Sequence, residues 1–389
     1  MLVEGLQGDA CTGARPVASQ CLLPDGFHVL PWGKADQIGL IPAWDRLASR
    51  AVSPNPFFEP WYLLPSLEAF DPAGKAHLMI LVEGGELRAL VPNWRDPSHQ
   101  GRPLAHFAPW LHANMFCGVP LIVEGTERSF WQAYLAHLDV APDQAWFLHL
   151  PLLPADCSVS RALGLLCKDQ GRQLVEVHRV SRAMLQSGPS PEQHLAQAMS
   201  TKKRKELRRQ RARLEEIGPL RVQRSRDRQG LDQWIDGFLA LERRGWKGER
   251  GSAMASDPRS ERVFRQALAG AAALGRLERL ALYCSDRPIA MLTTFLSPPG
   301  AFSYKTSFDE DFARFSPGLL LQLENLALLD DPNIAWCDSC AAADHPMIER
   351  IWRDRREIVW LSAGIGRGLR RKGGELWARL EARRAERRA

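Results

Sequence analysis

The chain has 389 residues, a net charge of +6, and ordinary shares of apolar (45%) and charged (25%) residues, which exclude a disordered or fibrous protein. This length predicts two domains, each with a core of its own. No run reaches the roughly 18 apolar residues of a membrane span, and residues 1–24 lack the features of a secretory signal. The eight cysteines do not have the spacing of a disulfide framework. We therefore expect a cytoplasmic protein.

Two segments carry the positive charge. Residues 202–213 hold eight basic side chains against Glu206, and residues 367–389 hold nine against three acidic ones. The rest of the chain is therefore acidic, and strong attraction to nucleic acid is not implied. Leu207 and Leu214 would dock the first segment on the body, so we interpret it as a solvated connector. Contact with anionic polymer, a membrane surface or tRNA is the alternative.

The first half of the chain alternates strand and helix signals. A hairpin is expected at Gly84-Gly85, because paired glycines can adopt positive φ. The expected elements are a strand at 27–31, helices at 41–51 and 58–70, strands at 76–82, 87–94 and 115–123, a helix at 127–138, a strand at 145–150, a helix at 159–170 and a strand at 173–180.

The second half repeats the same ten-element order. A helix at 191–217 precedes it, with Pro191 at its entry and Gly218 just past its end. Then follow a strand at 220–224, helices at 231–244 and 258–274, strands at 277–284, 288–296 and 301–308, a helix at 317–329, a strand at 334–337, a helix at 346–353 and a strand at 357–361. We therefore predict an N-terminal extension (1–25), a first lobe (26–188), a basic connector helix (189–218), a second lobe (219–363) and a basic C-terminal helix (364–389).

This repeated β-α-α-β-β-β-α-β-α-β order resembles the GNAT acyltransferase fold, and two copies resemble the Fem-type peptidyl transferases. Five stretches also resemble the CelD/BcsL-like acetyltransferases associated with cellulose and exopolysaccharide synthesis: KKRKELRRQRARL (202–214), LERRGWKG (241–248), YKTSFD (304–309), FSPGLL (315–320) and DSCAAADHPMIERIW (338–352). The resemblance covers residues 191–361, and the first lobe only by element order. The Arg/Gln-x-x-Gly-x-Gly/Ala loop that is usual in the superfamily is reduced here to Arg314-x-x-x-Gly318. The Tyr-Lys pair often found there before the last Trp is absent.

The resemblance implies an α/β (α+β) fold of two tandem lobes, each a mixed, mainly antiparallel sheet flanked by helices, joined by the basic helix. It implies acyl transfer from acetyl-CoA or another acyl-CoA, without a metal, to an amine or hydroxyl of a saccharide or polysaccharide precursor. The alternatives are a Fem-like aminoacyl-tRNA-dependent transferase, in which the basic helix grips tRNA, and a non-catalytic binding module in a polysaccharide-synthesis complex.

The donor diphosphate is expected at the start of the helix beginning at Pro317, because helix N-termini bind anions through free N–H groups and the helix dipole. Glu124 and Glu127 at the matching junction of the first lobe would repel a diphosphate, which assigns the donor to the second lobe. The expected donor-binding residues are Ser316 as N-cap, Pro317, Gly318, Leu319, Arg314 and Lys305. Two alternatives are that Ser-Pro-Gly merely begins a helix and that Lys305 is an edge lysine.

A general base is expected, since an amine with a pKa near 10.4 is neutral in only about one molecule in 10³ to 10⁴ at pH 7. Our candidates are Asp338, Asp344 and His345. Asp344 could instead be a helix N-cap, and His345 a surface residue. Trp246 and Lys247 are expected to border the acceptor, although Trp246 could plug the neighbouring helix pair.

Overall fold

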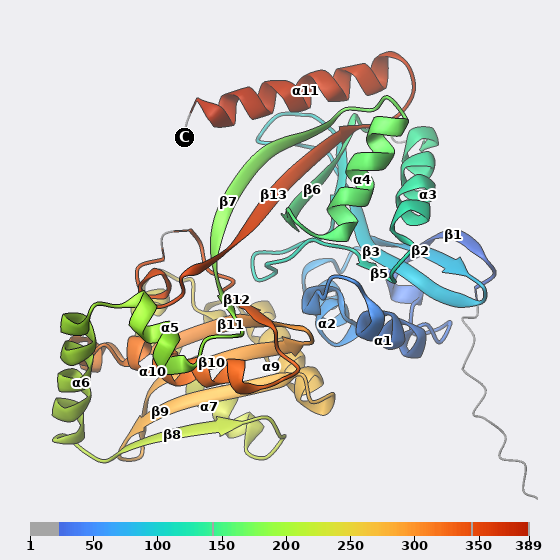
Figure 1. The fold of residues 1–389 in the computed structure, drawn as a ribbon. Coiled ribbons are helices and arrows are strands. Elements are labelled where there is room, and N and C mark those ends of the chain that lie inside the picture. Colours follow the sequence, from blue (N-terminus) through green and yellow to red (C-terminus); the bar gives the residue numbers. More distant parts are fainter. Residues whose placement is uncertain (1–22, 142–143, 344, 388–389) are drawn as a thin grey trace, which may run out of the picture.

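The computed structural model describes residues 23–387 except 142, 143 and 344, so most of the expected N-terminal extension lies outside the described residues (Figure 1). The first lobe follows the expected order closely. Its elements are β1 (Gly26–Pro31), α1 (Ile41–Arg50), α2 (Pro60–Phe70), β2 (His77–Glu83), β3 (Glu86–Asp96), β4 (His106–Pro109), β5 (Leu121–Ile122), α3 (Glu127–Val140), β6 (Phe147–Pro154), α4 (Ser158–Asp169) and β7 (Leu174–Gln186).

The second half repeats this order from β8 onward. Two helices, α5 (Pro191–Ala198) and α6 (Thr201–Glu215), connect the halves. The later elements are β8 (Leu220–Ser225), α7 (Leu231–Arg244), α8 (Trp246–Glu249), α9 (Pro258–Ala273), β9 (Leu277–Cys284), β10 (Arg287–Ser297), β11 (Gly300–Phe308), α10 (Pro317–Asn325), β12 (Trp336–Asp338), β13 (Asp354–Gly364) and α11 (Leu369–Glu386).

Within the described residues the strands form one sheet that runs through both lobes. Its order is β1-β2-β3-β4-β6-β13-β7-β12-β11-β10-β9-β8, with β5 pairing β3. The pairs are antiparallel except β4 with β6 and β11 with β12. A mixed, mainly antiparallel sheet flanked by helices is the fold class that the sequence predicts, and the prediction is confirmed (Figure 1).

Two strands tie the lobes together. β13, assigned by its place in the sequence to the second lobe, lies between β6 and β7 of the first lobe. The last residues of β7 cross the other way, and Met184 to Gln186 pair with β12. This exchange could not be predicted, because strand pairing depends on partners that are far away along the chain.

Three expected elements differ in the structure. The expected single helix at 191–217 is two helices: Met199 is extended and buried, and Ser200 caps α6 by accepting the Lys203 N–H. Of the expected strand at 115–123, only Leu121–Ile122 forms a strand, and Val123 adds an isolated bridge to Ala51. The expected helix at 346–353 is a single 3₁₀ turn (Ile348–Arg350), because the fully buried Ile351 and Trp352 lead directly into β13.

An aromatic cluster joins the lobes on the helix side of the sheet. Phe57 and Tyr62 meet Phe302 and Tyr304, with ring centroids 5.7 and 5.8 Å apart, and the hydroxyls of Tyr62 and Tyr304 lie 3.1 Å apart. All four rings are buried. Aromatic edge contacts of this kind stabilise an interface beyond the area they bury.

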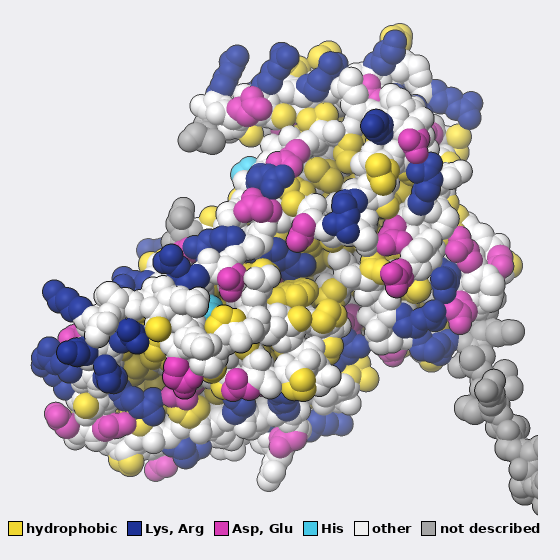
Figure 2. Space-filling model, in the orientation of Figure 1, with side chains coloured by type: hydrophobic (Ala, Val, Ile, Leu, Met, Phe, Trp, Pro, Cys, Tyr) yellow, Lys and Arg dark blue, Asp and Glu magenta, His cyan; other side chains and the backbone are white. Residues whose placement is uncertain are grey.

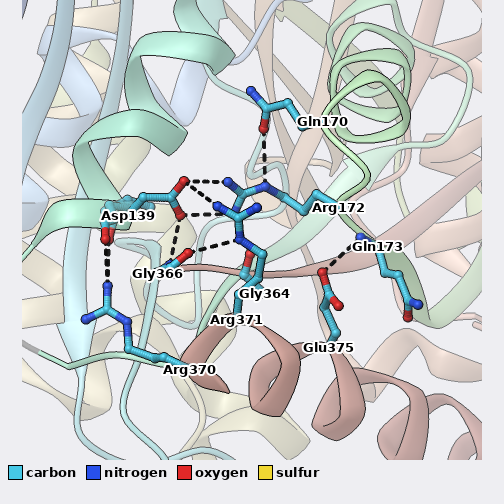
Figure 3. A network of polar contacts seen from close by, with 10 residues as sticks. Asp139, Gln170, Arg172, Gln173, Gly364, Gly366, Arg370, Arg371 and Glu375 are labelled. Carbon is cyan, nitrogen blue, oxygen red and sulfur yellow. Dashed lines mark hydrogen bonds and ion pairs between the residues drawn. The ribbon is translucent and has the colours of Figure 1, made fainter. Parts of the chain in front are cut away.

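The start of α11 is fastened to the first lobe by a polar network (Figure 3). Arg172 and Arg371 both pair with the Asp139 carboxylate, at 2.6 and 3.0 Å. Arg370 donates to the Asp139 carbonyl (2.9 Å), and Glu375 accepts the Gln173 N–H (3.2 Å). One face of α11 is therefore fixed against the sheet.

No helix in the described part of the chain is long and apolar enough to cross a membrane. Nor do its described residues contain three or more His, Cys, Asp or Glu side chains grouped to hold a metal ion. The C-x-x-C pair, Cys337 and Cys340, is buried, and burial raises the pKa of both thiols.

Three histidines of the first lobe, of which His106 is buried and His112 and His149 are half-buried, make stability depend on pH. Burial lowers the pKa of His106 to about 4, and that of His112 and His149 to about 3, from the ordinary 6.5. The unfolded chain therefore binds more protons than the folded chain between roughly pH 3 and 6.5. This contribution to stability is fully present above pH 6.5 and is lost as the pH falls.

We expect the urea midpoint to decrease from pH 7 to pH 5. Replacing His149, which donates or accepts a 2.9 Å hydrogen bond with Ser362, by Gln should make the midpoint less dependent on pH. Equilibrium unfolding at several pH values measures this. The exposed His178 replaced by Gln is the control, and an unchanged slope in His149→Gln would contradict the assignment.

Candidate functional site

A cavity opens where β11 and β12 separate. The two parallel strands pair only through residues 300–302 and 336–338, while β11 continues to Phe308. Beyond the last pair lies a cavity of about 700 Å³. Its wall comprises β11, the start of α10, the segment after β12 and one residue of the first lobe. The lining residues are Phe116, Trp246, Lys247, Ser303, Tyr304, Lys305, Thr306, Phe308, Ala313, Ser316, Pro317, Gly318, Leu319, Ser339, Cys340, Ala341, Ala342, His345, Pro346, Met347, Ile348 and Arg350.

A β-bulge shapes the strand that forms this wall. Thr293 of β10 pairs with Lys305 and Thr294 pairs with Ser303, so Tyr304 has no partner on β10. Bulges bend a strand and redirect its side chains. Ser303, Tyr304 and Lys305 consequently all line the cavity, whereas regular alternation would turn one of them away.

The N-terminus of α10 faces this cavity with free amide groups. Pro317 occupies the first helical position, as expected, and has no N–H. No hydrogen bond among the described residues uses the N–H of Gly318 or Leu319. A Cβ on Gly318 would lie 2.8 Å from Met347 Sδ and 3.3 Å from Phe308 Cδ1, both cavity-lining residues. The helix start is therefore open to a ligand only because residue 318 is glycine.

Ser316 occupies the N-cap position of α10, as the sequence predicts, but it caps the helix without a side-chain hydrogen bond. Its backbone is left-handed (φ 53°, ψ 50°), and its side chain makes no capping hydrogen bond. A capping side chain needs extended backbone to reach the N–H groups that follow. The Ser316 hydroxyl accepts none of these N–H groups, which leaves them free for an anion.

Two lysines line the cavity beside Arg350 and contribute positive charge to it. Lys305 Nζ donates to Asn114 Oδ1 of the first lobe (2.7 Å), and burial lowers its pKa to about 8. Lys247 Nζ donates to the buried Glu242 and to the Thr306 carbonyl, both at 2.9 Å. No carboxylate is found among the described lining residues, so the cavity favours anionic ligands.

The two expected acceptor residues also lie at this cavity. The Trp246 ring is 42% exposed and lies under the Arg250 guanidinium (5.2 Å), so it does not plug the helix pair. Its backbone N–H donates to Glu310 Oε1 (2.5 Å), which fixes the loop beside η4 (Glu310–Phe315). An exposed indole face beside a cavity can stack on a sugar ring.

His345 is placed where it could exchange a proton. It lines the cavity, and burial lowers its pKa below the ordinary value, helped by the nearby Lys247 charge. Its Nδ1 accepts the Ile348 N–H at 3.5 Å, a weak bond. The lowered pKa favours the neutral imidazole. Its unprotonated nitrogen is then Nδ1, so the weak bond from the Ile348 N–H must break before His345 can take a proton.

Two expected site residues lie elsewhere. Asp338 is buried outside the cavity lining, and its carboxylate accepts from Arg182 (3.3 Å), Arg356 (3.4 Å) and the Cys340 N–H (2.8 Å). These partners hold the carboxylate in an ion cluster outside the cavity lining, which argues against Asp338 as the base. Arg314 lies over the Phe315 ring (4.6 Å) and does not line the cavity. Asp344 lies outside the described residues.

Residues that the sequence did not point to complete the site. Asn114 and Phe116 come from the first lobe, and Phe116 lies 5.7 Å from Lys305 Nζ. Met347 and Arg350 come from the segment expected to be a helix. No local pattern could have identified Asn114 or Phe116, because only the tertiary fold brings them to β11.

The matching opening of the first lobe is closed. β4 and β6 pair only through Phe107 and Leu148, but the following segment crosses the gap, with the Gly118 N–H donating to the Leu152 carbonyl (3.0 Å). A Cβ on Gly118 would lie 2.2 Å from the Pro151 carbonyl oxygen. The strands that separate around a cavity in the second lobe are therefore bridged by protein in the first.

Comparison with known proteins agrees with this geometry. Residues 201–345 match the sequence family described as an acetyltransferase (GNAT) domain, and they contain β11, α10 and β12. Most of the residues that line the cavity lie within this matched segment, which is similar to that family. No protein of curated function matches the sequence.

Solved structures share the fold across both lobes. The crystal structure of FemX is similar with a TM-score of 0.52 at 10% identity, over 82% of this chain and 95% of that one. The C-terminal domain of a candidate lysylphosphatidylglycerol synthetase from Agrobacterium fabrum gives 0.51 at 13% identity, over 88% and 95%. A conserved protein of unknown function from Bacteroides thetaiotaomicron gives 0.54 at 10% identity, over 84% and 97%.

Replacing Asp338 by Asn tests its structural role. The change leaves the buried Arg182 without its counter-ion, so we expect a loss of about 3 to 5 kcal/mol in the free energy of unfolding. Equilibrium denaturation in urea measures it. Glu357→Gln is the control, because its ion pair with Arg179 is exposed and should contribute less than about 1 kcal/mol. A stable but inactive Asp338→Asn protein would restore the catalytic interpretation.

Proposed function

We propose that this chain transfers an acetyl or similar acyl group from acyl-CoA to an amine or hydroxyl acceptor. The observation that carries the proposal is the cavity at the start of α10, where the N–H groups of Gly318 and Leu319 are free. Such a helix terminus suits the diphosphate of a CoA thioester. The absence of carboxylates among the described lining residues also favours an anionic donor.

The separated strands suit the rest of the donor. Beyond Phe302, β11 has no strand partner on the β12 side, so its backbone groups can pair with the amides of an extended pantetheine arm. The thioester would then lie within the same cavity as His345 and Lys305. In the transfer, the acceptor nitrogen or oxygen attacks the thioester carbonyl, His345 takes the acceptor proton, and the CoA thiolate leaves.

The acceptor we propose is a saccharide or a polysaccharide precursor, in the cytoplasm. Its class rests on the resemblance to CelD/BcsL-like acetyltransferases, and the exposed Trp246 ring beside Lys247 offers a surface for a sugar. A Fem-like transferase would bind aminoacyl-tRNA in a salt-sensitive manner instead. A non-catalytic module would bind neither acyl-CoA nor aminoacyl-tRNA. Titration calorimetry with acetyl-CoA and with aminoacyl-tRNA separates the three functions.

Replacing Gly318 by Ala tests the donor site. The new methyl group would displace Met347 and narrow the approach to the free N–H groups, so we expect acetyl-CoA to bind about tenfold more weakly, roughly 1.4 kcal/mol. Calorimetry measures the dissociation constant. Gly237→Ala is the matched control, since a Cβ there meets only Met291 at an ordinary 3.7 Å. Equal affinities for the two variants would refute the assignment.

Replacing His345 by Gln tests the proposed base. We expect kcat to fall by about 10² or more while the affinity for acetyl-CoA changes little, because the imidazole acts on the acceptor proton. The low-pH limb of the kcat profile should also disappear. Release of the CoA thiol in the presence of amino sugars measures turnover, with His178→Gln as the control. An unchanged pH profile would mean that another group is the base.

A further inference from the structure

The outer face of α11 carries a stripe of exposed leucines. Leu369, Leu376 and Leu380 are 86%, 52% and 38% exposed. Their spacings of seven and four residues place them on one side of the helix. The buried residues Gly374 and Ala378 lie on the opposite side. The stripe therefore points away from the protein.

The orientation of α11 is fixed at both ends. Asp139 holds its first turns through Arg371, as Figure 3 shows. Near its C-terminus the Glu381 carboxylate accepts from Gln100 (2.6 Å) and lies 3.0 Å from His99 Nε2. The helix cannot rotate to bury its leucines without breaking these buried contacts.

Unpaired cations flank the leucine stripe. Lys372, Arg379 and Arg383 are exposed, and no ion pair within the described residues involves them. Figure 2 shows dark-blue and yellow side chains mixed along the upper edge of the molecule, where α11 lies. Trp146, 40% exposed, extends the apolar surface, because a Cβ on Gly373 of α11 would lie 2.5 Å from its ring.

We propose that α11 binds the surface of an anionic phospholipid bilayer. An amphipathic helix with leucines and an aromatic ring between cations lies in the plane of the interface, with its apolar side chains among the acyl chains and its cations at the phosphates. The proposal is independent of the acyl-transfer reaction and requires no membrane-spanning segment.

A second copy of the chain suits this face less well. In a twofold contact the same surface meets itself, which would bring Lys372, Arg379 and Arg383 toward their own copies. Nucleic acid would use the cations but gain nothing from exposed leucines. α6 provides the contrast within this chain, because its cations are exposed while Leu207 and Leu214 are buried.

Sedimentation of the full chain with vesicles tests the proposal. We expect binding to vesicles of equal parts phosphatidylglycerol and phosphatidylcholine, and none to phosphatidylcholine alone. The leucine variant, Leu376→Gln with Leu380→Gln, should bind the anionic vesicles at least about tenfold more weakly than the native chain. The same loss is expected of the triple variant Lys372→Gln, Arg379→Gln and Arg383→Gln. These positions are exposed, so an unchanged melting temperature is expected to accompany the loss.

A matched variant of α6 separates this surface from general attraction to charge. The triple variant of α6 is Lys202→Gln, Lys205→Gln and Arg209→Gln, which removes as many cations as the triple variant of α11. It should retain vesicle binding within about twofold. The proposal is wrong if the leucine variant binds like the native chain, or if the α6 variant alone loses binding. It is also wrong if native mass spectrometry shows that the native chain is a dimer and that, among the variants, only the leucine variant is a monomer.

Discussion

The end of β7 is the constraint on which both lobes depend. Met184 pairs with Asp354 of β13 on one side and with Asp338 of β12 on the other, so a single strand belongs to both halves of the sheet. At this point Arg182 and Arg356 converge on the Asp338 carboxylate. A buried carboxylate between two guanidiniums is costly to desolvate unless all three groups remain in place. The cluster therefore fixes how the lobes join.

This junction also determines the geometry of the cavity. Because β12 is held against β7, it follows β11 for only three residues before the strands separate. The bulge at Tyr304 turns β11 at the same place, and the Tyr304 hydroxyl lies against that of Tyr62 in the first lobe. Neither lobe alone would hold the wall of the cavity in position.

Much of the fold could be predicted from the sequence, because it rests on local patterns. Alternating apolar residues and turn glycines mark the strands of both lobes, and Pro317 correctly marks the start of α10. The strand exchange could not be predicted, since β13 has the same pattern whichever sheet it joins. Nor could the left-handed backbone of Ser316, because serine before proline is equally typical of an extended cap.

The candidate site, like the fold, could be predicted where it rests on local sequence patterns. Lys247, Lys305, Gly318 and His345 all lie at one cavity, because they sit on the elements whose order the sequence reveals. The surroundings of Asp338 could not be predicted for a physical reason: a carboxylate at the end of a strand has the same sequence pattern whether it faces solvent or two arginines. Its partners come from β7 and β13, which are distant in sequence.

The segment between β4 and β5 closes the gap in the first lobe and completes the cavity of the second lobe. Between β4 and β5 the chain crosses the first-lobe gap at Gly118. A few residues earlier it places Phe116 in the wall of the second-lobe cavity and Asn114 against Lys305. Arg182 holds this segment by donating to the Phe116 carbonyl (2.8 Å). The same guanidinium pairs with Asp338, so the ion cluster that joins the sheet also positions the partner of Lys305. The segment that closes the first lobe is therefore the one that completes the cavity of the second, and one arginine links it to the Asp338 cluster.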